Sequence, residues 1–194
     1  MIPFDTEISS ERLRLRKFSK SDIPFVFSAS RYEGFCDGMH WEPPISEDEL
    51  IAPYEDNLES WKEGVGYTFT IERSIDRVAV GRICIRKQND AVWDFGFWTH
   101  PDFYGLGYMT EATISLMNYG FTELLATEIQ ASHAVWNMAS RRVLEKAGFQ
   151  FSKHIPKVIE KNGKWVDEDL LVISRLQWQQ QSEQGSSHQP ATAP

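Results

Sequence analysis

The segment Tyr104–Thr110 has residue types that suit an anion-binding turn. It reads Tyr-Gly-Leu-Gly-Tyr-Met-Thr and lies between an expected strand end and an expected helix start. Gly105 and Gly107 can adopt backbone conformations that other residues avoid, and they let a ligand approach the chain. The unpaired N–H groups of a new helix carry roughly half a positive charge and attract phosphates. The segment therefore predicts a phosphate or pyrophosphate site, with a plain tight turn as the alternative.

Two well-known nucleotide motifs do not fit this segment. A Walker A loop would need Gly-Lys followed by Ser or Thr, which the sequence lacks. A dinucleotide fingerprint would need a third glycine where Thr110 stands. If the turn binds a phosphate, that phosphate belongs to a ligand of another class.

A second group of candidates lies in the expected helix 137–147. Asn137 suits the N-cap of this helix and could instead contact a ligand. Ser140 occupies the place where a capping box would have Glu or Gln, so capping does not explain it. Arg141 and Arg142 could meet a phosphate or lie in solvent, and the sequence leaves this open.

These segments resemble those of GNAT-type N-acetyltransferases. Tyr104–Ala112 is similar to the acetyl-CoA pyrophosphate loop of that family, although Tyr104 replaces a Gln or Arg and Met109 a Gly or Ala. With His-Pro before the loop and Thr-Glu-Ala within it, the segment resembles the RimJ/RimL branch, whose named members acetylate ribosomal-protein N-termini. Further segments that resemble this branch are Ser10–Arg16, Asn137–Phe149 and Gly163–Asp167.

The resemblance implies an acetyl-CoA site. Backbone N–H groups of the turn would hold the pyrophosphate, and the end of a strand would pair with the pantetheine amides. The side chain of Trp98 is better explained as core packing than as a ligand contact. The implied cofactor-binding residues are Phe97, Trp98, Thr99, Tyr104, Gly105, Leu106, Gly107, Tyr108, Met109, Thr110, Asn137 and Ser140.

The resemblance also implies that Ser140 donates to the departing sulfur. For a general base the candidates are Asp94, which shares a strand face with Gly96 and Trp98, and Glu42 in a Trp-Glu-Pro-Pro loop. Glu111 is a third candidate, but an acid in the first turn of a helix is also favoured by the helix dipole.

Neither of two other reactive side chains has a predicted part in the chemistry. His133 ends a strand and is expected to be structural, and Cys84 falls inside a strand pattern and is expected in the core.

Alternating and helical patterns predict the elements that must position these residues. Ser46 and Glu49 form a capping-box pair that should open a helix to about Glu63. The order of elements predicts an α/β domain with one mixed, mostly antiparallel sheet flanked by helices, the GNAT fold of the resemblance. The expected strands are 11–18, 67–72, 78–86, 92–99, 127–133, 149–160 and 165–176, and a long helix is expected at 107–125.

Length and composition limit the protein class. The 194 residues should form one domain over 6–178, followed by a disordered tail over 179–194 that is rich in Gln, Ser and Pro. A net charge of −8 argues against direct nucleic-acid binding and would suit a cationic substrate or simple solubility. The two cysteines have no metal-ligand spacing, so no metal is expected.

No apolar run long enough for a membrane span and no signal peptide is visible, so a cytoplasmic protein is expected.

The sequence therefore predicts an enzyme that moves the acetyl group of acetyl-CoA to a primary amine. At pH 7.5 an α-amine with a pKa near 8 loses its proton for roughly 0.5 kcal/mol, whereas a lysine-like amine costs about 4 kcal/mol. Because no compelling base is visible, a ribosomal or other protein N-terminus is the favoured partner. A small amine, a polyamine, an antibiotic or a non-catalytic CoA-binding regulatory module are the alternatives, and monomer and homodimer are both open.

Overall fold

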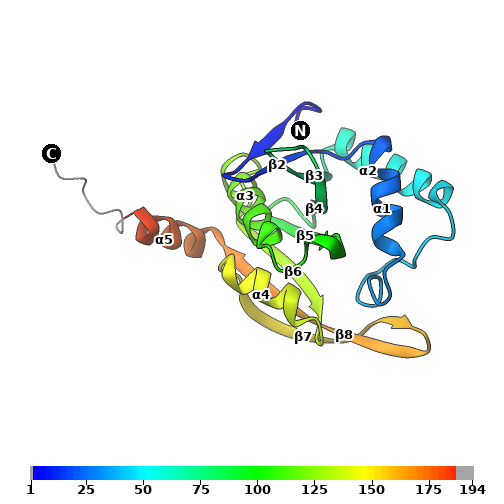
Figure 1. Cartoon of the computed structure of the whole chain (residues 1–194). Helices are drawn as coiled ribbons and strands as arrows, with labels where there is room; N and C mark the ends of the chain where they lie inside the picture. The colour runs from blue at the N-terminus through cyan, green and yellow to red at the C-terminus, as the bar shows by residue number, and fades with distance from the viewer. Residues whose placement is uncertain (1, 187–194) are drawn as a thin grey trace.

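The computed structural model describes residues 2–186, which form one eight-stranded sheet with helices on both faces (Figure 1). Along the sheet the strands follow the order β1-β2-β3-β4-β5-β6-β8-β7. The pair β5–β6 is parallel and the other neighbouring pairs are antiparallel, which confirms the predicted mixed sheet. The strands are β1 (Glu7–Ser9), β2 (Leu13–Lys17), β3 (Gly66–Arg73), β4 (Ala79–Lys87), β5 (Val92–Thr99), β6 (Glu128–Ala134), β7 (Gln150–Lys161) and β8 (Lys164–Ser174).

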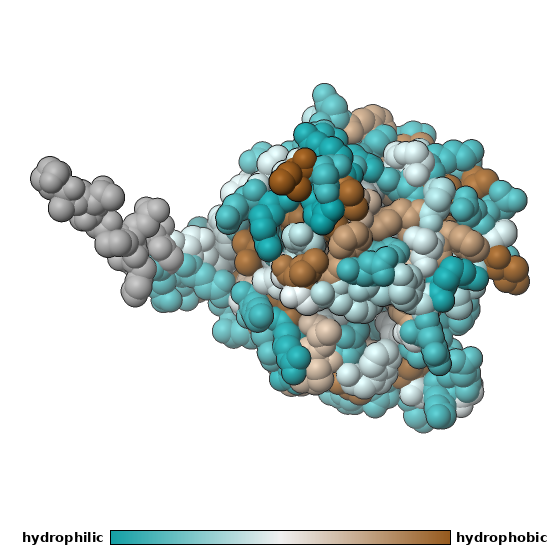
Figure 2. Space-filling model, in the orientation of Figure 1, coloured by the Kyte–Doolittle hydropathy of each residue, from teal (hydrophilic) through white to brown (hydrophobic). Residues whose placement is uncertain are grey.

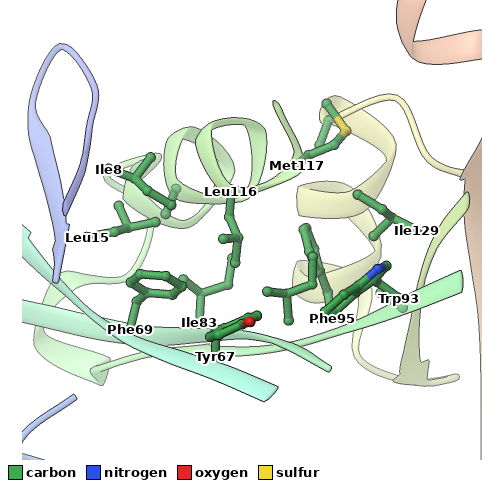
Figure 3. Close-up of a cluster of buried hydrophobic side chains, with 14 of the residues drawn as sticks. Ile8, Leu15, Tyr67, Phe69, Ile83, Trp93, Phe95, Leu116, Met117 and Ile129 are labelled. Atoms are coloured by element: carbon green, nitrogen blue, oxygen red, sulfur yellow. The ribbon is translucent and has the colours of Figure 1, made fainter. Parts of the chain in front are cut away.

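The main hydrophobic core lies between one face of the sheet and the helix α3 (Tyr108–Thr122). Buried positions of α3 recur at helical spacing and include Leu116, Met117 and Phe121. Figure 3 shows Leu116 above Phe69 and Ile83 of the sheet. Burial of each such side chain contributes about 1.5–3 kcal/mol, so this layer fixes where α3 begins relative to the strands.

The opposite face of the central strands is polar. On β4 the residues Arg82, Cys84 and Arg86 alternate with buried Ile83 and Ile85. The helices α1 (Ile23–Ser30) and α2 (Ile51–Glu63) lie on this side of the sheet (Figure 1). Short 3-10 turns precede them at Lys20–Asp22 and Glu47–Leu50. The polar face of the sheet beneath α1 and α2 suits a polar ligand.

The predicted start of α2 differs from the structure. Ser46 makes no side-chain cap, and the Glu49 carboxylate accepts from the N–H of Ile45 (2.8 Å) rather than from that of Ser46. The first turn is therefore a 3-10 turn, and the capping-box prediction is wrong. Sequence spacing alone could not show that the carboxylate would turn to a preceding residue.

The predicted disorder after Trp178 is also wrong as far as residue 186, because α5 (Arg175–Ser186) continues through it. The indole of Trp178 stacks on Phe121 at 5.1 Å between ring centroids and donates to the Asn118 side chain (2.7 Å). Gln181 donates to the carbonyl of Gly148 (3.3 Å). One partly buried aromatic and one amide thus hold a helix whose composition suggested none. Residues 187–194 lie outside the described residues.

The surface on the side shown in Figure 2 is mainly hydrophilic, with separate hydrophobic patches. This is the ordinary surface of a folded domain. Within residues 2–186, no helix combines the length and the hydropathy needed to cross a bilayer.

Candidate active site

The parallel strands β5 and β6 separate at one end. Their pairing runs from Val92 and Glu128 to Phe95 and Ala131, yet β5 continues to Thr99 and β6 to Ala134. The end of β5 therefore has no strand neighbour on its β6 side. Its free backbone N–H and C=O groups can pair with an extended ligand, as a neighbouring strand would.

A cavity of about 850 Å³ lies at this separation. We name it the first cavity. The ends of β5 and β6, the turn before α3, and the helix α4 (Met138–Lys146) form most of its wall. All predicted cofactor-binding residues line it except Leu106, whose carbonyl accepts from Arg12 Nη1 (3.2 Å). The structure thus brings together residues from three separate parts of the sequence.

The turn before α3 has the geometry of an anion site. Gly105 and Gly107 have φ of 77° and 78°, which disfavours other residues. A Cβ at Gly105 would meet no atom within 4 Å, so open space lies beside the turn. The helix starts at Tyr108, and the N–H of Glu111 donates to the carbonyl of Gly107 (3.2 Å). The N–H groups before Glu111, at the start of the helix, have no carbonyl of an earlier helical turn to donate to. A phosphate bound at the turn would accept hydrogen bonds from these N–H groups.

Met109 departs from the family pattern without disturbing this geometry. Its side chain is only 6% exposed and belongs to the main core. A Cβ on Gly81 would lie 3.3 Å from the Met109 methyl carbon, so the thioether is directed toward β4. The backbone N–H of Met109 is therefore unaffected by its larger side chain.

Glu111 has a structural place rather than a place in the cavity. Its carboxylate accepts from Ser10 Oγ (2.7 Å), Arg12 N (2.8 Å) and Arg12 Nε (2.7 Å). Burial would raise the pKa of Glu111, but these hydrogen bonds hold it below its usual value. A carboxylate occupied in this way is a poor base, and it ties the turn to the start of β2. Sequence reasoning missed Arg12 as a support of the turn.

The N-cap prediction for Asn137 is confirmed. Its Oδ1 accepts from the N–H of Ser140 (3.1 Å). Ser140 lines the first cavity, and within residues 2–186 its hydroxyl makes no hydrogen bond. Arg142 also lines this cavity, whereas Arg141 pairs with Glu145 (2.8 Å) and does not. Ser140 is thus held by the cap with its hydroxyl unengaged.

His133 supports the view that the first cavity receives a ligand. Its side chain is buried and lines the cavity. Nδ1–H donates to the carbonyl of Ala134 (2.8 Å), while the buried Nε2 has no partner among the described residues. Buried polar atoms are normally paired, so Nε2 lacks a donor that residues 2–186 do not supply.

A second cavity of about 570 Å³ lies on the other side of β5. We name it the second cavity. The polar face of the sheet, α1, α2 and the loop around Trp41 form its wall. Gly96, Phe97 and Trp98 line both cavities. Trp98 also packs against Phe25 and Phe35 with ring centroids 5.5 and 5.4 Å apart, which agrees with its predicted packing role. Two ligands could therefore meet at one short stretch of β5.

Asp94 and a residue that the sequence analysis missed, Glu168, line the second cavity. Asp94 accepts from Arg86 Nη2 (2.6 Å), and burial raises the pKa of Asp94 above its usual value despite Arg86. Glu168 is 4% exposed, and His40 Nε2 donates to it (2.6 Å). Its signal in the sequence is an acid at an inward position of β8, between buried Val166 and Leu170.

Glu42 lies in the loop where the sequence analysis placed it, whereas Cys84 does not lie in the core. Glu42 pairs with Lys161 Nζ (2.7 Å), and its side chain is 75% exposed at the rim of the second cavity. Both acids are ion-paired, but Glu42 is exposed whereas burial raises the pKa of Asp94, so Glu42 is the weaker base candidate. Cys84 lines the same cavity and is half-buried, so its predicted place in the core is wrong. It belongs to the polar face of β4. Among the described residues, no cluster of His, Cys, Asp and Glu could hold a metal ion.

Comparisons with known proteins, by sequence and by fold, both find acetyltransferases. The family model described as "Acetyltransferase (GNAT) domain" matches residues 12–150. A probable N-acetyltransferase, YjcK of Bacillus subtilis (strain 168), is 34% identical over 126 residues, which cover 63% of this chain and 68% of that protein.

Two solved structures share the fold. RimL, a ribosomal L7/L12 α-N-protein acetyltransferase in complex with coenzyme A, has a TM-score of 0.78 at 19% identity, over 87% of this chain and 98% of its own. Spermidine N-acetyltransferase from Vibrio cholerae, in complex with CoA and spermine, has a TM-score of 0.77 at 21% identity, over 88% of this chain and 99% of its own. At these identities the likeness concerns the fold alone.

Proposed function

The chain belongs to the GNAT family of acetyltransferases, and on that basis we propose that it moves the acetyl group of acetyl-CoA to a protein N-terminal α-amine. The observation that carries this proposal is the wall of β5 that the two cavities share. One cavity offers phosphate-binding N–H groups and a free strand edge, and the other offers carboxylates. This arrangement fits two substrates that react across one strand.

The residues of the first cavity fit acetyl-CoA in three respects. The turn at Gly105–Gly107 and the start of α3 suit a pyrophosphate. The unpaired edge of β5 suits the amides of pantetheine. The orphaned Nε2 of His133 suits a donor from a bound group. In an acidic protein this site attracts an anion through helix and turn N–H groups without needing a basic patch.

Bound acetyl-CoA would supply an activated acetyl group as a thioester. The N–H groups at the end of β5 would donate to the carbonyl oxygen as negative charge develops there. The Ser140 hydroxyl, which has no other partner in residues 2–186, would donate to the departing sulfur. Asp94 in the second cavity would accept the proton of the attacking amine.

The acceptor could also be a polyamine, since the Vibrio cholerae spermidine acetyltransferase has the same fold. The second cavity argues against a polycation. Its acids are already engaged: Asp94 with Arg86, Glu168 with His40, and Glu42 with Lys161. The guanidinium of Arg82 lies in the same cavity without an ion pair among the described residues and would repel further positive charge. A single α-amine is the better fit.

An amine panel with acetyl-CoA tests the proposal. Peptides with a free N-terminus, spermidine, and a peptide whose only amine is a lysine side chain would be compared by release of free CoA. We expect turnover with N-terminal α-amines and at least about tenfold lower kcat/KM with the other two. Preferred turnover of spermidine would contradict the N-terminal proposal. Tight acetyl-CoA binding without any turnover would favour the regulatory-module alternative.

We predict that Asp94→Asn lowers kcat/KM at pH 7.5 by about 100-fold, the range expected for loss of a general base. The carboxyl must be ionised to accept a proton, and its pKa is raised by burial. Activity of the wild type should therefore fall as the pH drops through that raised pKa, and this limb of the profile should vanish in Asp94→Asn. Glu168→Gln is the comparison variant, and a larger loss there would transfer the role of base to Glu168.

We predict that Asn137→Ala raises the KM for acetyl-CoA and lowers the free energy of unfolding by about 1 kcal/mol, the value of a lost N-cap. The cap bond from Ser140 N to Asn137 Oδ1 is present in the structure, so the stability effect is expected in the absence of any ligand. Thermal unfolding without ligand measures the stability effect, and steady-state kinetics with varied acetyl-CoA measures the KM. An unchanged KM would leave Asn137 as a cap alone.

A further inference from the structure

Arg82 lies on β4 at the floor of the second cavity. Its strand position pairs with Thr70 of β3 on one side and with Trp98 of β5 on the other. The guanidinium carbon lies 3.8 Å from the centroid of the Phe18 ring. The side chain therefore leaves the polar face of the sheet, rests on an aromatic ring and lines the cavity next to the shared wall of β5.

Apart from its contact with the Phe18 ring, the Arg82 guanidinium has no polar partner among the described residues. Within residues 2–186 it makes no hydrogen bond and no ion pair, and its Nε is fully buried. Burial lowers the pKa of Arg82 to about 10. A guanidinium carries five N–H donors, and leaving the buried Nε–H unpaired is costly. Of the four buried side-chain atoms without a hydrogen bond in residues 2–186, only Arg82 Nε belongs to a cationic group that also has no ion pair, so this group calls for a ligand.

The acids nearest to Arg82 are already engaged. Asp22 accepts two bonds from Arg16 (2.6 and 2.8 Å) and one each from Ser19 N (2.9 Å) and Thr70 Oγ1 (2.9 Å). Its negative charge reaches Arg82 only through space. Asp94 on the neighbouring strand pairs with Arg86. The charge of Arg82 is therefore not matched by a hydrogen-bonded carboxylate of this chain.

We propose that Arg82 binds a carboxylate of the acceptor, so that the preferred amines are those that also carry an acidic group. The inference rests on the proposed function, because it assumes that the second cavity receives the amine. Cys84 of β4 pairs with Gly96, and Arg82 is two positions from Cys84, or about 7 Å along the strand. An amine that reacts at Gly96–Trp98 thus has its own carboxylate within reach of this guanidinium. A planar guanidinium binds a carboxylate through two parallel hydrogen bonds.

The carboxylate could be an acidic side chain near a peptide N-terminus or the α-carboxylate of a free amino acid. Matched acceptors separate these sources. Peptide amides with Glu or Gln, and with Asp or Asn, at the first or second position test the side chain. Phenylalanine against phenylalanine amide tests the α-carboxylate. We expect one of these comparisons to favour the acid by about 100-fold in kcat/KM, since a buried donor left unpaired discriminates strongly.

Arg82→Met tests the residue itself, with the exposed Arg77→Met as its matched control. Arg82→Met should remove the preference, lowering kcat/KM for the acid about 100-fold while leaving the neutral analogue within about threefold. Because the substitution removes an unpaired buried charge, its melting temperature should equal or exceed that of the wild type. Arg82→Lys keeps the charge without the planar fork and should retain part of the preference. Arg77→Met should change neither the preference nor kcat/KM.

The outcomes separate this inference from the proposed function. Turnover of acidic and neutral acceptors at equal rates in the wild type would overturn the role of Arg82 and leave the acetyltransferase proposal intact. A lower melting temperature with equal losses on both acceptors would show that Arg82 is structural and would also overturn it. An absence of turnover with every amine, despite acetyl-CoA binding, would instead contradict the proposed function on which the inference rests.

Discussion

Gly107→Val is expected to abolish acetyl-CoA binding, with at least about a 100-fold rise in Kd, or about 2.7 kcal/mol. Gly107 has φ of 78° and caps α3, so its neighbours' N–H groups converge on the space beside the turn. A Cβ there would lie 3.5 Å from Arg12 Nη2, so a β-branched side chain would crowd the turn and would also strain it. Both effects remove the place for a pyrophosphate. Calorimetric titration of the folded variant with acetyl-CoA measures the loss.

Gly163→Val is the matched control for backbone strain. Gly163 has φ of 73° in the turn between β7 and β8, and a Cβ there would meet no atom within 4 Å. It does not line either cavity. Both variants should lose similar stability, but Gly163→Val should bind acetyl-CoA as the wild type does. Near-wild-type affinity in Gly107→Val would remove the pyrophosphate assignment.

Ser140→Ala is expected to lower kcat and kcat/KM together by about 10- to 1000-fold, with acetyl-CoA affinity nearly intact. The hydroxyl lines the first cavity without a partner in residues 2–186, so the ground state loses little when it is removed. An interaction that forms only as charge develops on sulfur would be lost in the transition state. Because the Asn137 cap uses the backbone N–H of Ser140, stability should hardly change.

Two further variants sharpen the Ser140 test. Ser140→Cys should restore little activity, since a thiol is a weak hydrogen-bond donor. Ser115→Ala is the control, because Ser115 lies on α3 outside both cavities and its hydroxyl donates to the Glu111 carbonyl (3.0 Å). It should keep full turnover. Full turnover in Ser140→Ala would remove Ser140 from the mechanism and direct attention to Tyr108, which lines the same cavity.

Local features of the site could be predicted because a few neighbouring residues determine them. The turn at Gly105–Gly107, the start of α3 and the Asn137 cap depend on conformations and bonds within four residues. The strand patterns of β3, β4 and β5 depend on which side chains face α3. For these features, the period of the apolar residues and the chemistry of the turn agree with the structure.

The other features depend on pairs that are distant in the sequence. Arg12 and Glu111 are 99 residues apart, and His40 and Glu168 are 128 apart. No local pattern indicates which acid will meet which base after the sheet forms. The division of the site into two cavities has the same origin, since β5 and β6 pair over only four positions before they separate. The helix α5 was missed because one aromatic contact outweighs its polar composition.

The two cavities have consequences for how specificity can diverge within one scaffold. All the cavity-lining residues between positions 40 and 57 belong to the second cavity, and nearly all of those between 99 and 146 belong to the first, with Ser132 shared. Under the proposed function, substitutions in the former stretch would change the acceptor preference while the cofactor site is inherited unchanged. A substitution would affect both sites at once only at the residues that line both cavities, which are Gly38, Met39, Phe95, Gly96, Phe97, Trp98 and Ser132.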